Sequence, residues 1–280
     1  MNDVFSLISV QPFRKHTDPL EQWQYIQDLL SEYLDNHPSY LKTTCMVALP
    51  EYALGNELFT SQKIDYEKIF EKIQEFVKSN GIYLVAGSAG VKDHEQWKNR
   101  AFFWDKLGKL LGTYDKQRLF NYEKKLKLTP GTSNKIFTVD SQALKVQILI
   151  CSDFWYPELI RADLHQLPDV VIIPASSVVP RQELTSYGRT LWHSLAMTRA
   201  RESVVPVLVS DWAVQLQEKS WTSGGSSLVN PSTRWYIILF QYFISKSHGL
   251  KEVNHLEIGI QRSIKSMIHC GSSRMKQSFT

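Results

Sequence analysis

The chain has 280 residues, of which 43% are hydrophobic and 21% are charged, and its formal net charge is +4. These values are ordinary for a globular protein with one sizeable core, and they argue against a disordered or fibrous chain. The small net charge gives no overall indication of a nucleic-acid or membrane partner.

The three cysteines, Cys45, Cys151 and Cys270, lie far apart in the sequence. An odd number at such spacing predicts neither a disulfide framework nor a zinc site, so we expect a reduced, cytoplasmic setting. The N-terminal residues lack the basic segment and the cleavage site of a secretory signal. The longest apolar stretch, WYIILFQYFI from Trp235, has about half the length of a membrane span.

The first half of the chain alternates between strand-like and helix-like apolar patterns. Apolar residues recur at helical spacing over 19–34 and 64–77, which predicts two amphipathic helices. The segment 99–116 predicts two strands joined by a tight turn at Asp105–Gly108. Short apolar runs predict buried strands at 4–11, 45–50 and 82–90.

The second half repeats this alternation. Proline is well tolerated in a first helical turn, so PELIRADLHQL from Pro157 predicts a helix, and a longer helix is predicted over 184–202. Strands are predicted at 136–140, 144–151, 169–176, 204–210, 223–230 and 233–240. Strands and helices in this order predict a sheet-rich α/β domain with helices on its outer faces.

Cys151 occupies the end of one predicted strand. It follows the nearly unbroken apolar run 146–150, and three aromatic residues and the helix predicted from Pro157 come after it. Nucleophiles of strand–turn–helix enzymes stand at such a position. A single buried cysteine is also a common inert core residue, so Cys151 needs partners from elsewhere in the chain.

Two ionisable residues stand in similar positions. Glu51 follows the strand predicted at 45–50, and Lys116 follows the predicted hairpin. Each has an alternative interpretation on its own, Glu51 as a solvated charge and Lys116 as the start of the basic stretch 116–127. Because strand ends gather in one crevice of a parallel or mixed sheet, the three residues together favour a common site.

A series of short motifs runs through the chain in this order: LPE (49–51), AGS (86–88), Asn99, TPG (129–131), ICSDFWYPELIRAD, PAS (174–176), TRARES (198–203) and GGSSLVNP (224–231). This ordered series resembles the nitrilase superfamily of carbon–nitrogen hydrolases. The resemblance covers 4–231 and implies a four-layer αββα sandwich, with Glu51, Lys116 and Cys151 as the catalytic residues and Glu123 as a supporting carboxylate.

The implied roles agree with the chemistry of these groups. Cys151 would attack as the thiolate, Glu51 would move its proton, and Lys116 with the backbone N–H of Ser152 would stabilise an oxyanion. A thioester of this kind needs no metal and no organic cofactor. We expect the substrate pocket to include Tyr52, Phe154 and Trp155. Family members that recognise carboxylates place arginines near 154–155, so the aromatic residues disfavour recognition of an acidic substrate from this stretch.

The predicted function is therefore hydrolysis of a small-molecule amide or N-carbamoyl amide. Two alternatives remain open: a catalytically silent ligand-binding relative, and a nitrilase or N-acyltransferase with the same triad. The sequence contains no G-x-G-x-x-G between strand and helix, no Walker A motif, no H-E-x-x-H and no G-x-S-x-G. The basic stretch 116–127 is too narrow a footprint for nucleic-acid binding, and we expect neither a nucleic-acid nor a membrane partner.

The resemblance also predicts a homodimer. The expected interface combines the helix predicted from Pro157 with the helix over 184–202, because both carry more large apolar residues than one core face needs. The alternative is that both faces are buried within a monomer. We expect one domain over 1–260 and a tail over 261–280, either flexible or an arm of the dimer. The apolar residues in question are Leu159, Leu164, Leu191, Trp192, Leu195 and Met197.

Overall fold

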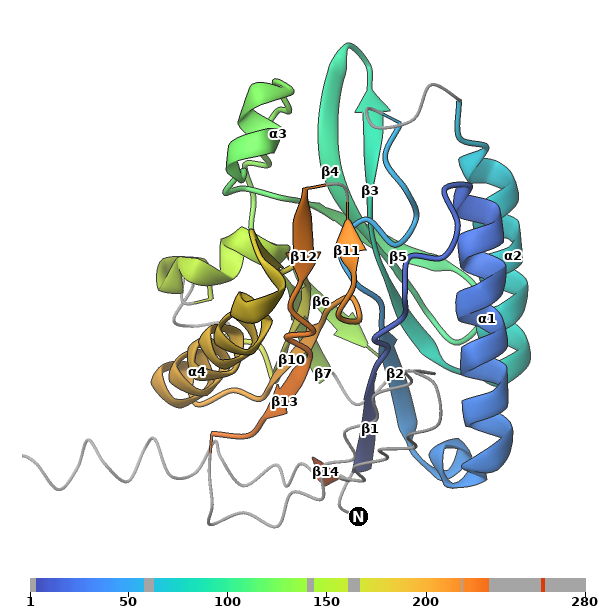
Figure 1. Ribbon diagram of the computed structural model, residues 1–280. Helices are drawn as coiled ribbons and strands as arrows, with labels where there is room; N and C mark the ends of the chain where they lie inside the picture. The colour runs from blue at the N-terminus through green and yellow to red at the C-terminus, as the bar shows by residue number, and fades with distance from the viewer. Residues whose placement is uncertain are drawn as a thin grey trace, which may run out of the picture.

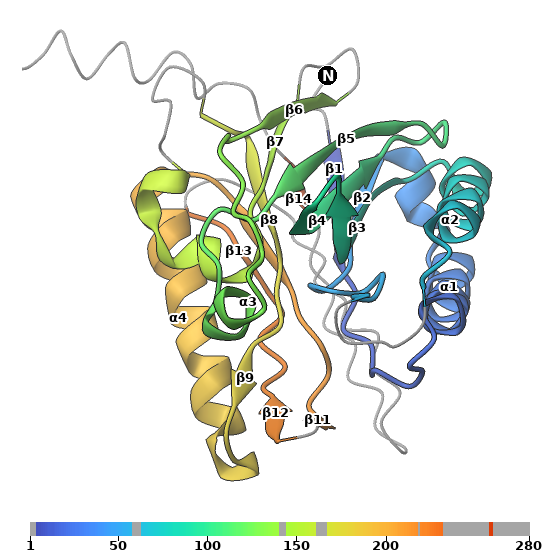
Figure 2. The ribbon, with the colours of Figure 1, turned by 90° about the horizontal axis from the view of Figure 1, so that it is seen from above.

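Two mixed β-sheets packed face to face form the centre of the protein (Figures 1 and 2). The computed structural model describes residues 4–57, 63–139, 144–160, 167–217, 219–231 and 258–259. The first sheet has the order β14-β1-β2-β3-β4-β5, in which β1, β2 and β3 are parallel and the remaining pairs are antiparallel. Its strands are β1 (Val4–Ser9), β2 (Thr44–Ala48), β3 (Tyr83–Asp93), β4 (Gln96–Trp104), β5 (Leu110–Asp115) and β14 (Ile258–Gly259).

The second sheet has the order β13-β10-β8-β7-β6, with parallel pairing among β7, β8 and β10. The outer strands β6 and β13 pair antiparallel with their neighbours. A small third sheet has the order β11-β12-β9. The strands are β6 (Ile136–Val139), β7 (Leu144–Ile148), β8 (Val170–Pro174), β9 (Val178–Val179), β10 (Val207–Ser210), β11 (Leu216–Gln217), β12 (Ser220–Thr222) and β13 (Ser227–Val229).

Helices cover the outer faces of both large sheets, which confirms the predicted αββα layering (Figure 2). Helices α1 (Pro19–Asn36) and α2 (Tyr66–Asn80) pack on the first sheet, and α4 (Thr185–Ser203) packs on the second. Helix α3 (Asn121–Lys125) and four 3₁₀ helices, Pro38–Lys42, Cys151–Trp155, Pro157–Leu159 and Gln182–Leu184, are short. No helix in the described ranges has the length and apolarity needed to cross a membrane.

Local sequence explains where the two long outer helices begin and end. The Asp18 carboxylate accepts hydrogen bonds from the first two free N–H groups of α1, each at 2.9 Å. Asp65 caps α2 in the same way at 3.1 Å, and Gly81 ends that helix with a left-handed φ of 62°. Both helices lie outside the site, where they seal the apolar face of the first sheet.

The sheets are joined near the ends of their parallel strands. Ser210 at the end of β10 donates its hydroxyl hydrogen to the carbonyl oxygens of Val10 and Ala48, which belong to the first-sheet side. Ser9 donates at 3.0 Å to the carbonyl of Val209. These buried bonds hold the carboxyl ends of strands from both sheets together, so side chains that follow the strands converge.

The predicted elements agree with the structure except after Cys151. There the chain forms the 3₁₀ helices Cys151–Trp155 and Pro157–Leu159, so the helix predicted from Pro157 is wrong at its start, because the residues must first turn sharply out of the sheet. Its remaining part over 161–166 lies outside the described residues. The predicted strand over 233–240, Cys270 and the predicted tail over 261–280 lie outside the described residues. Of the apolar residues predicted for an interface, Leu159 and Trp192 are buried in this chain, Leu195 is partly buried, Leu191 and Met197 are exposed, and Leu164 is not among the described residues.

Candidate active site

Glu51, Lys116 and Cys151 converge in the structure. Glu51 stands in the turn after β2, Lys116 directly follows β5, and Cys151 follows β7 in the other sheet. Their exposed fractions are 1%, 1% and 8%. Burial of an acid, a base and a thiol together requires strong mutual interactions, because an unpaired buried charge costs several kcal/mol.

One ammonium group lies between two carboxylates. Lys116 Nζ is 2.7 Å from Glu51 Oε1 and 2.8 Å from Glu123 Oε2. The side-chain amide of Asn99 donates to both carboxylates, at 2.9 Å to Glu51 and 2.7 Å to Glu123. The Tyr52 hydroxyl donates to Glu123 at 2.7 Å. The two carboxylates are therefore close neighbours that share a cation and an amide.

The surroundings displace the pKa values of the two carboxyl groups in opposite directions. Burial raises the pKa of Glu51, and the negative charge of Glu123 adds to this effect, against the attraction of Lys116. Burial also acts on Glu123, but Lys116 and the hydrogen bonds from Phe120 N–H and Tyr52 outweigh it and lower the pKa of Glu123. Glu123 thus stays ionised beside Lys116, while Glu51 is the carboxylate suited to exchanging a proton.

Cys151 is held in a conformation that few non-glycine residues adopt. Its φ is 47°, in the left-handed region, and this strain turns the thiol out of the sheet at the end of the strand. The thiol donates a hydrogen bond to the carbonyl oxygen of Ser176 at 3.9 Å, and the charges of Glu51 and Lys116 act on it. Burial and the charge of Glu51 raise the pKa of Cys151, with Lys116 acting in the opposite direction. The resting group is therefore a thiol whose proton can pass to Glu51.

Lys116 remains charged between the two carboxylates. Burial by itself would lower the pKa of Lys116, but the negative charges of Glu51 and Glu123 raise it well above its ordinary value. The Ser152 N–H lies next to the thiol, and no oxygen atom of the described residues accepts it in a hydrogen bond. An ammonium and a free N–H therefore both stand beside the nucleophile.

Asp153, which we did not predict as a site residue, joins the two sheets at the site. One of its carboxylate oxygens accepts from the backbone N–H groups of Gln117 at 3.0 Å and Arg118 at 2.6 Å. The other accepts from the Tyr114 hydroxyl at 2.8 Å and from the Ile150 N–H at 3.1 Å. Asp153 therefore ties the residues that flank the lysine to the strand end that carries the cysteine.

The residues predicted for the substrate pocket occupy different environments. Tyr52 belongs to the cluster through its bond to Glu123. Phe154 is fully buried, and its ring stacks on Trp192 of α4 at a centroid distance of 6.4 Å. Trp155 is 49% exposed, and its carbonyl accepts a bond from Arg199 of α4. The structure thus brings Tyr52 to the cluster and does not bring Phe154 or Trp155 there.

Sequence reasoning also missed contributions from Asn99 and Trp212. Asn99 lies on β4, where an alternating strand pattern gives no reason to single it out beyond its place in the motif series. Trp212 follows β10 and donates its indole N–H to the Glu51 carbonyl oxygen at 2.8 Å. A polar residue directly after a buried strand, as at Asp211–Trp212, is the signal that could have marked this segment.

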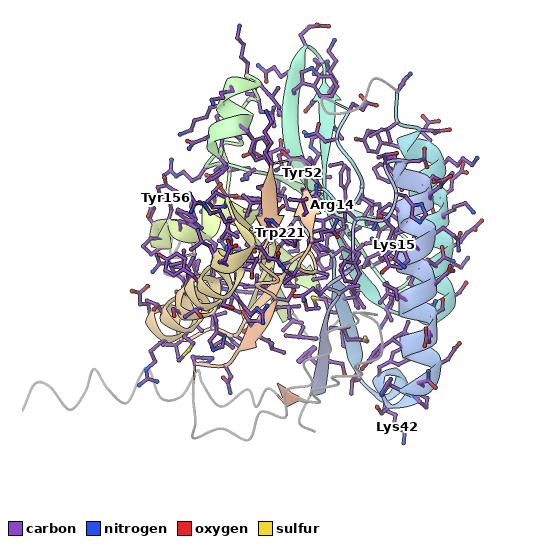
Figure 3. The ribbon with its side chains drawn as sticks, in the orientation of Figure 1. Arg14, Lys15, Lys42, Tyr52, Tyr156 and Trp221 are labelled. Carbon is purple, nitrogen blue, oxygen red and sulfur yellow. The ribbon has the colours of Figure 1, made fainter. Side chains whose placement is uncertain are left out.

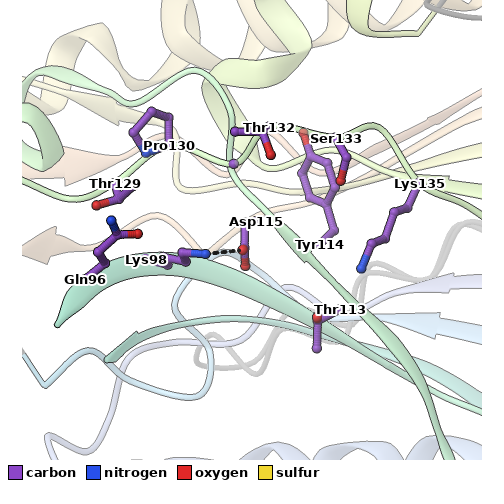
Figure 4. A pocket seen from close by; sticks show the side chains of 11 residues that line it. Gln96, Lys98, Thr113, Tyr114, Asp115, Thr129, Pro130, Thr132, Ser133 and Lys135 are labelled. Atoms are coloured by element: carbon purple, nitrogen blue, oxygen red, sulfur yellow. Dashed lines mark hydrogen bonds and ion pairs between the residues drawn. The ribbon is translucent and has the colours of Figure 1, made fainter. Parts of the chain in front are cut away.

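A separate pocket of about 310 Å³ lies beside the hairpin (Figure 4). Lys98 forms an ion pair with Asp115 there at 3.2 Å. The walls are supplied by residues 96, 98, 113–115, 129–133 and 135. Glu51, Lys116 and Cys151 do not line it. In the described ranges, no group of three or more His, Cys, Asp or Glu side chains is arranged to hold a metal ion.

Comparison with known proteins places this chain in a family. The family described as carbon-nitrogen hydrolase matches residues 7–237. The chain is 30% identical over 132 residues to a 2-oxoglutaramate amidase of Bacillus subtilis, covering 47% of this chain and 48% of that protein. It is 27% identical over 190 residues to an omega-amidase of Homo sapiens, covering 65% and 63%. The chain spans about half the length of the first curated relatives it matches, between 48% and 54%.

Solved structures share the fold. A carbon-nitrogen hydrolase of Helicobacter pylori superimposes with a TM-score of 0.71 at 17% identity, covering 99% of this chain and 96% of that one. Saccharomyces cerevisiae Nit3, a member of branch 10 of the nitrilase superfamily, gives 0.70 at 18% identity with the same coverage. These similarities establish a nitrilase-type αββα fold.

Proposed function

This chain belongs to the carbon–nitrogen hydrolase family, and on that premise we propose that it hydrolyses a small-molecule amide or N-carbamoyl amide through a thioester on Cys151. The observation that carries the proposal is the buried cluster in which one ammonium pairs with two carboxylates, one of which, Glu51, also interacts electrostatically with the Cys151 thiol. The pKa of Glu51 is raised and that of Glu123 is lowered, which separates a proton carrier from a fixed counter-ion.

In the first half of the proposed reaction, Cys151 attacks the carbonyl carbon of the amide. Glu51 accepts the thiol proton as the S–C bond forms, since the raised pKa of Cys151 leaves little thiolate at rest. The carbonyl oxygen becomes an oxyanion, which Lys116 Nζ and the Ser152 N–H stabilise. Glu51 then gives its proton to the leaving nitrogen, the C–N bond breaks, and ammonia or an amine departs.

In the second half, water attacks the thioester carbon. Glu51, again ionised, removes a proton from that water, and the same two donors stabilise the second oxyanion. The C–S bond breaks, the sulfur takes the proton back from Glu51, and the carboxylic acid product leaves. Every proton removed is returned within the cycle, so the residues of the cluster suffice for amide hydrolysis.

The decisive experiment follows the acyl-enzyme. An electrophilic amide analogue should label Cys151 much faster than Cys45 or Cys270, because Cys151 is the cysteine we place beside a base and a cation. Burial raises the pKa of Cys45, which has an exposed fraction of 1%. Equal labelling of the three cysteines in the native protein would refute the proposal, and Cys151→Ala provides the control for the labelled mass.

A substrate panel separates the proposed activity from its alternatives. Amides, N-carbamoyl amines and nitriles are supplied with and without an amine acceptor. Release of ammonia and acid from amides supports hydrolysis, turnover of nitriles alone supports a nitrilase, and transfer of the acyl group to the amine supports an N-acyltransferase. A stable acyl adduct with no turnover of any compound would identify a catalytically silent relative.

We also propose that the chain forms a homodimer through α4. Leu184, Tyr187 and Leu191 are 38%, 64% and 44% exposed, and their spacing places them on one stripe beside the partly buried Leu195. An apolar stripe of this kind is typical of obligate interfaces. Light scattering should give twice the mass of one chain at micromolar concentration, and Leu191→Glu should shift it toward the monomer. A monomeric mass for the native protein would exclude the dimer.

We place the protein in a reducing compartment, the cytoplasm, because the proposed reaction needs the Cys151 thiol. Both cysteines in the described part of the chain are free. Fractionation of cells with an antibody against the chain tests this placement, and a protein found only in an oxidising compartment would contradict it.

A further inference from the structure

An arginine that the proposed mechanism does not use lies beside the site. Arg14, in the loop between β1 and α1, donates from Nη2 to the Ser176 hydroxyl at 3.3 Å, and its guanidinium stacks over the Trp212 ring at 4.3 Å. The Ser176 carbonyl accepts from the Cys151 thiol, and the Trp212 indole donates to the Glu51 carbonyl. Arg14 therefore contacts two residues that each touch a member of the proposed triad.

This guanidinium has hydrogen-bonding capacity to spare. Its Nε is buried and has no acceptor, and no carboxylate of the described residues forms an ion pair with it. One acidic neighbour, Asp211, already accepts from Ser177, from the Trp212 N–H and from the Gly225 N–H. A buried, unfilled donor on a cation is costly unless an anion occupies the adjacent space.

The electrostatic surroundings agree with this geometry. Burial lowers the pKa of Arg14, while the charges of Tyr122, Glu51 and Asp211 act in the opposite direction. Glu51, Glu123 and Lys116 together carry one net negative charge in their ionised forms, which would repel an acidic substrate. Arg14 offsets that charge, so a carboxylate close to it meets a cation rather than a net negative site.

The loop that carries Arg14 is held in place from both sides. Gln22 of α1 bonds three backbone groups of residues 13–16, at 2.9–3.1 Å. Gln215 bonds the Arg14 N–H at 2.6 Å and the Arg14 carbonyl at 3.3 Å. Figure 3 shows Arg14 near Tyr52 at the centre of the molecule, whereas the neighbouring Lys15 lies toward α1, over the Tyr25 ring at 4.2 Å. A donor positioned in this way is prepared for a ligand before the ligand arrives.

We propose that Arg14 binds a carboxylate of the substrate, so that the preferred substrates are acidic amides in which the carboxylate is separated from the scissile amide by a short chain. The planar guanidinium offers an Nε and an Nη edge, which suits a carboxylate held by two bonds. This proposal rests on the proposed amide hydrolysis. We did not expect an anion-binding residue at 154–155, and Arg14 provides one from a different part of the chain.

The test compares glutaramate, the monoamide of glutaric acid, with valeramide, which has the same carbon chain without the carboxylate. The native protein should have the higher kcat/KM for glutaramate. Arg14→Met should lower the glutaramate-to-valeramide ratio of kcat/KM about tenfold to a hundredfold, mainly through KM, since bonds to charged groups are lost. Arg14→Lys should recover part of the ratio, and Lys15→Met, a matched cation on the same loop, should leave it unchanged.

Two further measurements make the result decisive. Thermal unfolding of each variant verifies that the loop change has not unfolded the protein. Calorimetric titration with glutarate measures carboxylate binding without any reaction, and Arg14→Met should weaken it by a similar factor. A ratio that Arg14→Met leaves unchanged, or glutarate binding equal in both proteins, would overturn the role of Arg14. If the native protein turns over neither amide and forms no thioester, the proposed function fails, and glutarate binding alone then decides on Arg14.

Discussion

Asp153→Asn is the substitution whose effect the structure defines most sharply. The side chain is fully buried, and it accepts four hydrogen bonds, two on each oxygen. In the asparagine variant an NH₂ group replaces one acceptor. If that NH₂ group faces Ile150, it opposes one backbone N–H donor. If it faces Gln117 and Arg118, it opposes two backbone N–H donors. We therefore expect a loss of about 1–3 kcal/mol in the free energy of unfolding at neutral pH, where Asp153 is ionised.

The pH dependence of that loss carries the test. Burial raises the pKa of Asp153 to about 6, above the ordinary value of an aspartate, about 3.9. The folded state therefore holds a proton that the unfolded state has already released, and the native protein loses stability as pH rises between these values. The difference corresponds to about 3 kcal/mol. Asparagine does not titrate, so the advantage of the native protein over the variant should shrink by about 2 kcal/mol between pH 4 and pH 7, since the unfolded aspartate is already partly ionised at pH 4.

Urea unfolding of both proteins at several pH values between 4 and 7 measures this difference. Other groups that titrate in the window cancel when the variant is subtracted from the native protein. Asp35→Asn, at an exposed position of α1, serves as the control and should show no such trend. A difference that stays constant, or that grows with pH, would refute the assignment of a raised pKa to Asp153.

Substitutions at three further residues test the proposed chemistry. Lys116→Met should slow formation of the acyl-enzyme about 10²–10³-fold while the protein remains folded, since an oxyanion donor is lost. Lys116→Arg should also fail to form the acyl-enzyme at the native rate, because a planar guanidinium does not replace a compact ammonium charge. Near-normal pre-steady-state acylation would mean that the lysine is misassigned. Glu123→Gln removes a negative charge that raises the pKa of Glu51, so the acid limb of the kcat/KM profile should move to lower pH, and an upward move would contradict the pairing. Asn99→Ala removes the amide donor shared by both carboxylates. It should lower kcat by a larger factor than its loss of stability explains, which single-turnover kinetics and thermal unfolding together measure.

Much of the fold was predictable because buried strands and amphipathic helices leave a local signature. Local residues alone predict the strands at 45–50 and 144–151 and the turn at Asp105–Gly108. The structure has strands at the first two places and a strand on each side of the turn. The segment after Cys151 was predicted wrongly for a local reason as well. Pro157 is compatible with a first helical turn, but the strained turn at Cys151 and the contacts of Asp153 hold the chain in 3₁₀ form.

By itself, the sequence determined that ionisable groups follow three strands, and hence that Glu51, Lys116 and Cys151 meet at one edge of the sheets. Only the tertiary structure decided which side chains complete the site, because Asn99, Asp153 and Arg14 act on partners that are distant in the chain. Their side-chain hydrogen bonds join residues that are 24 to 162 positions apart in the chain, except for the bond that the Ile150 N–H donates to Asp153. Such pairings depend on how the two sheets pack, and neither periodicity nor residue type records that packing.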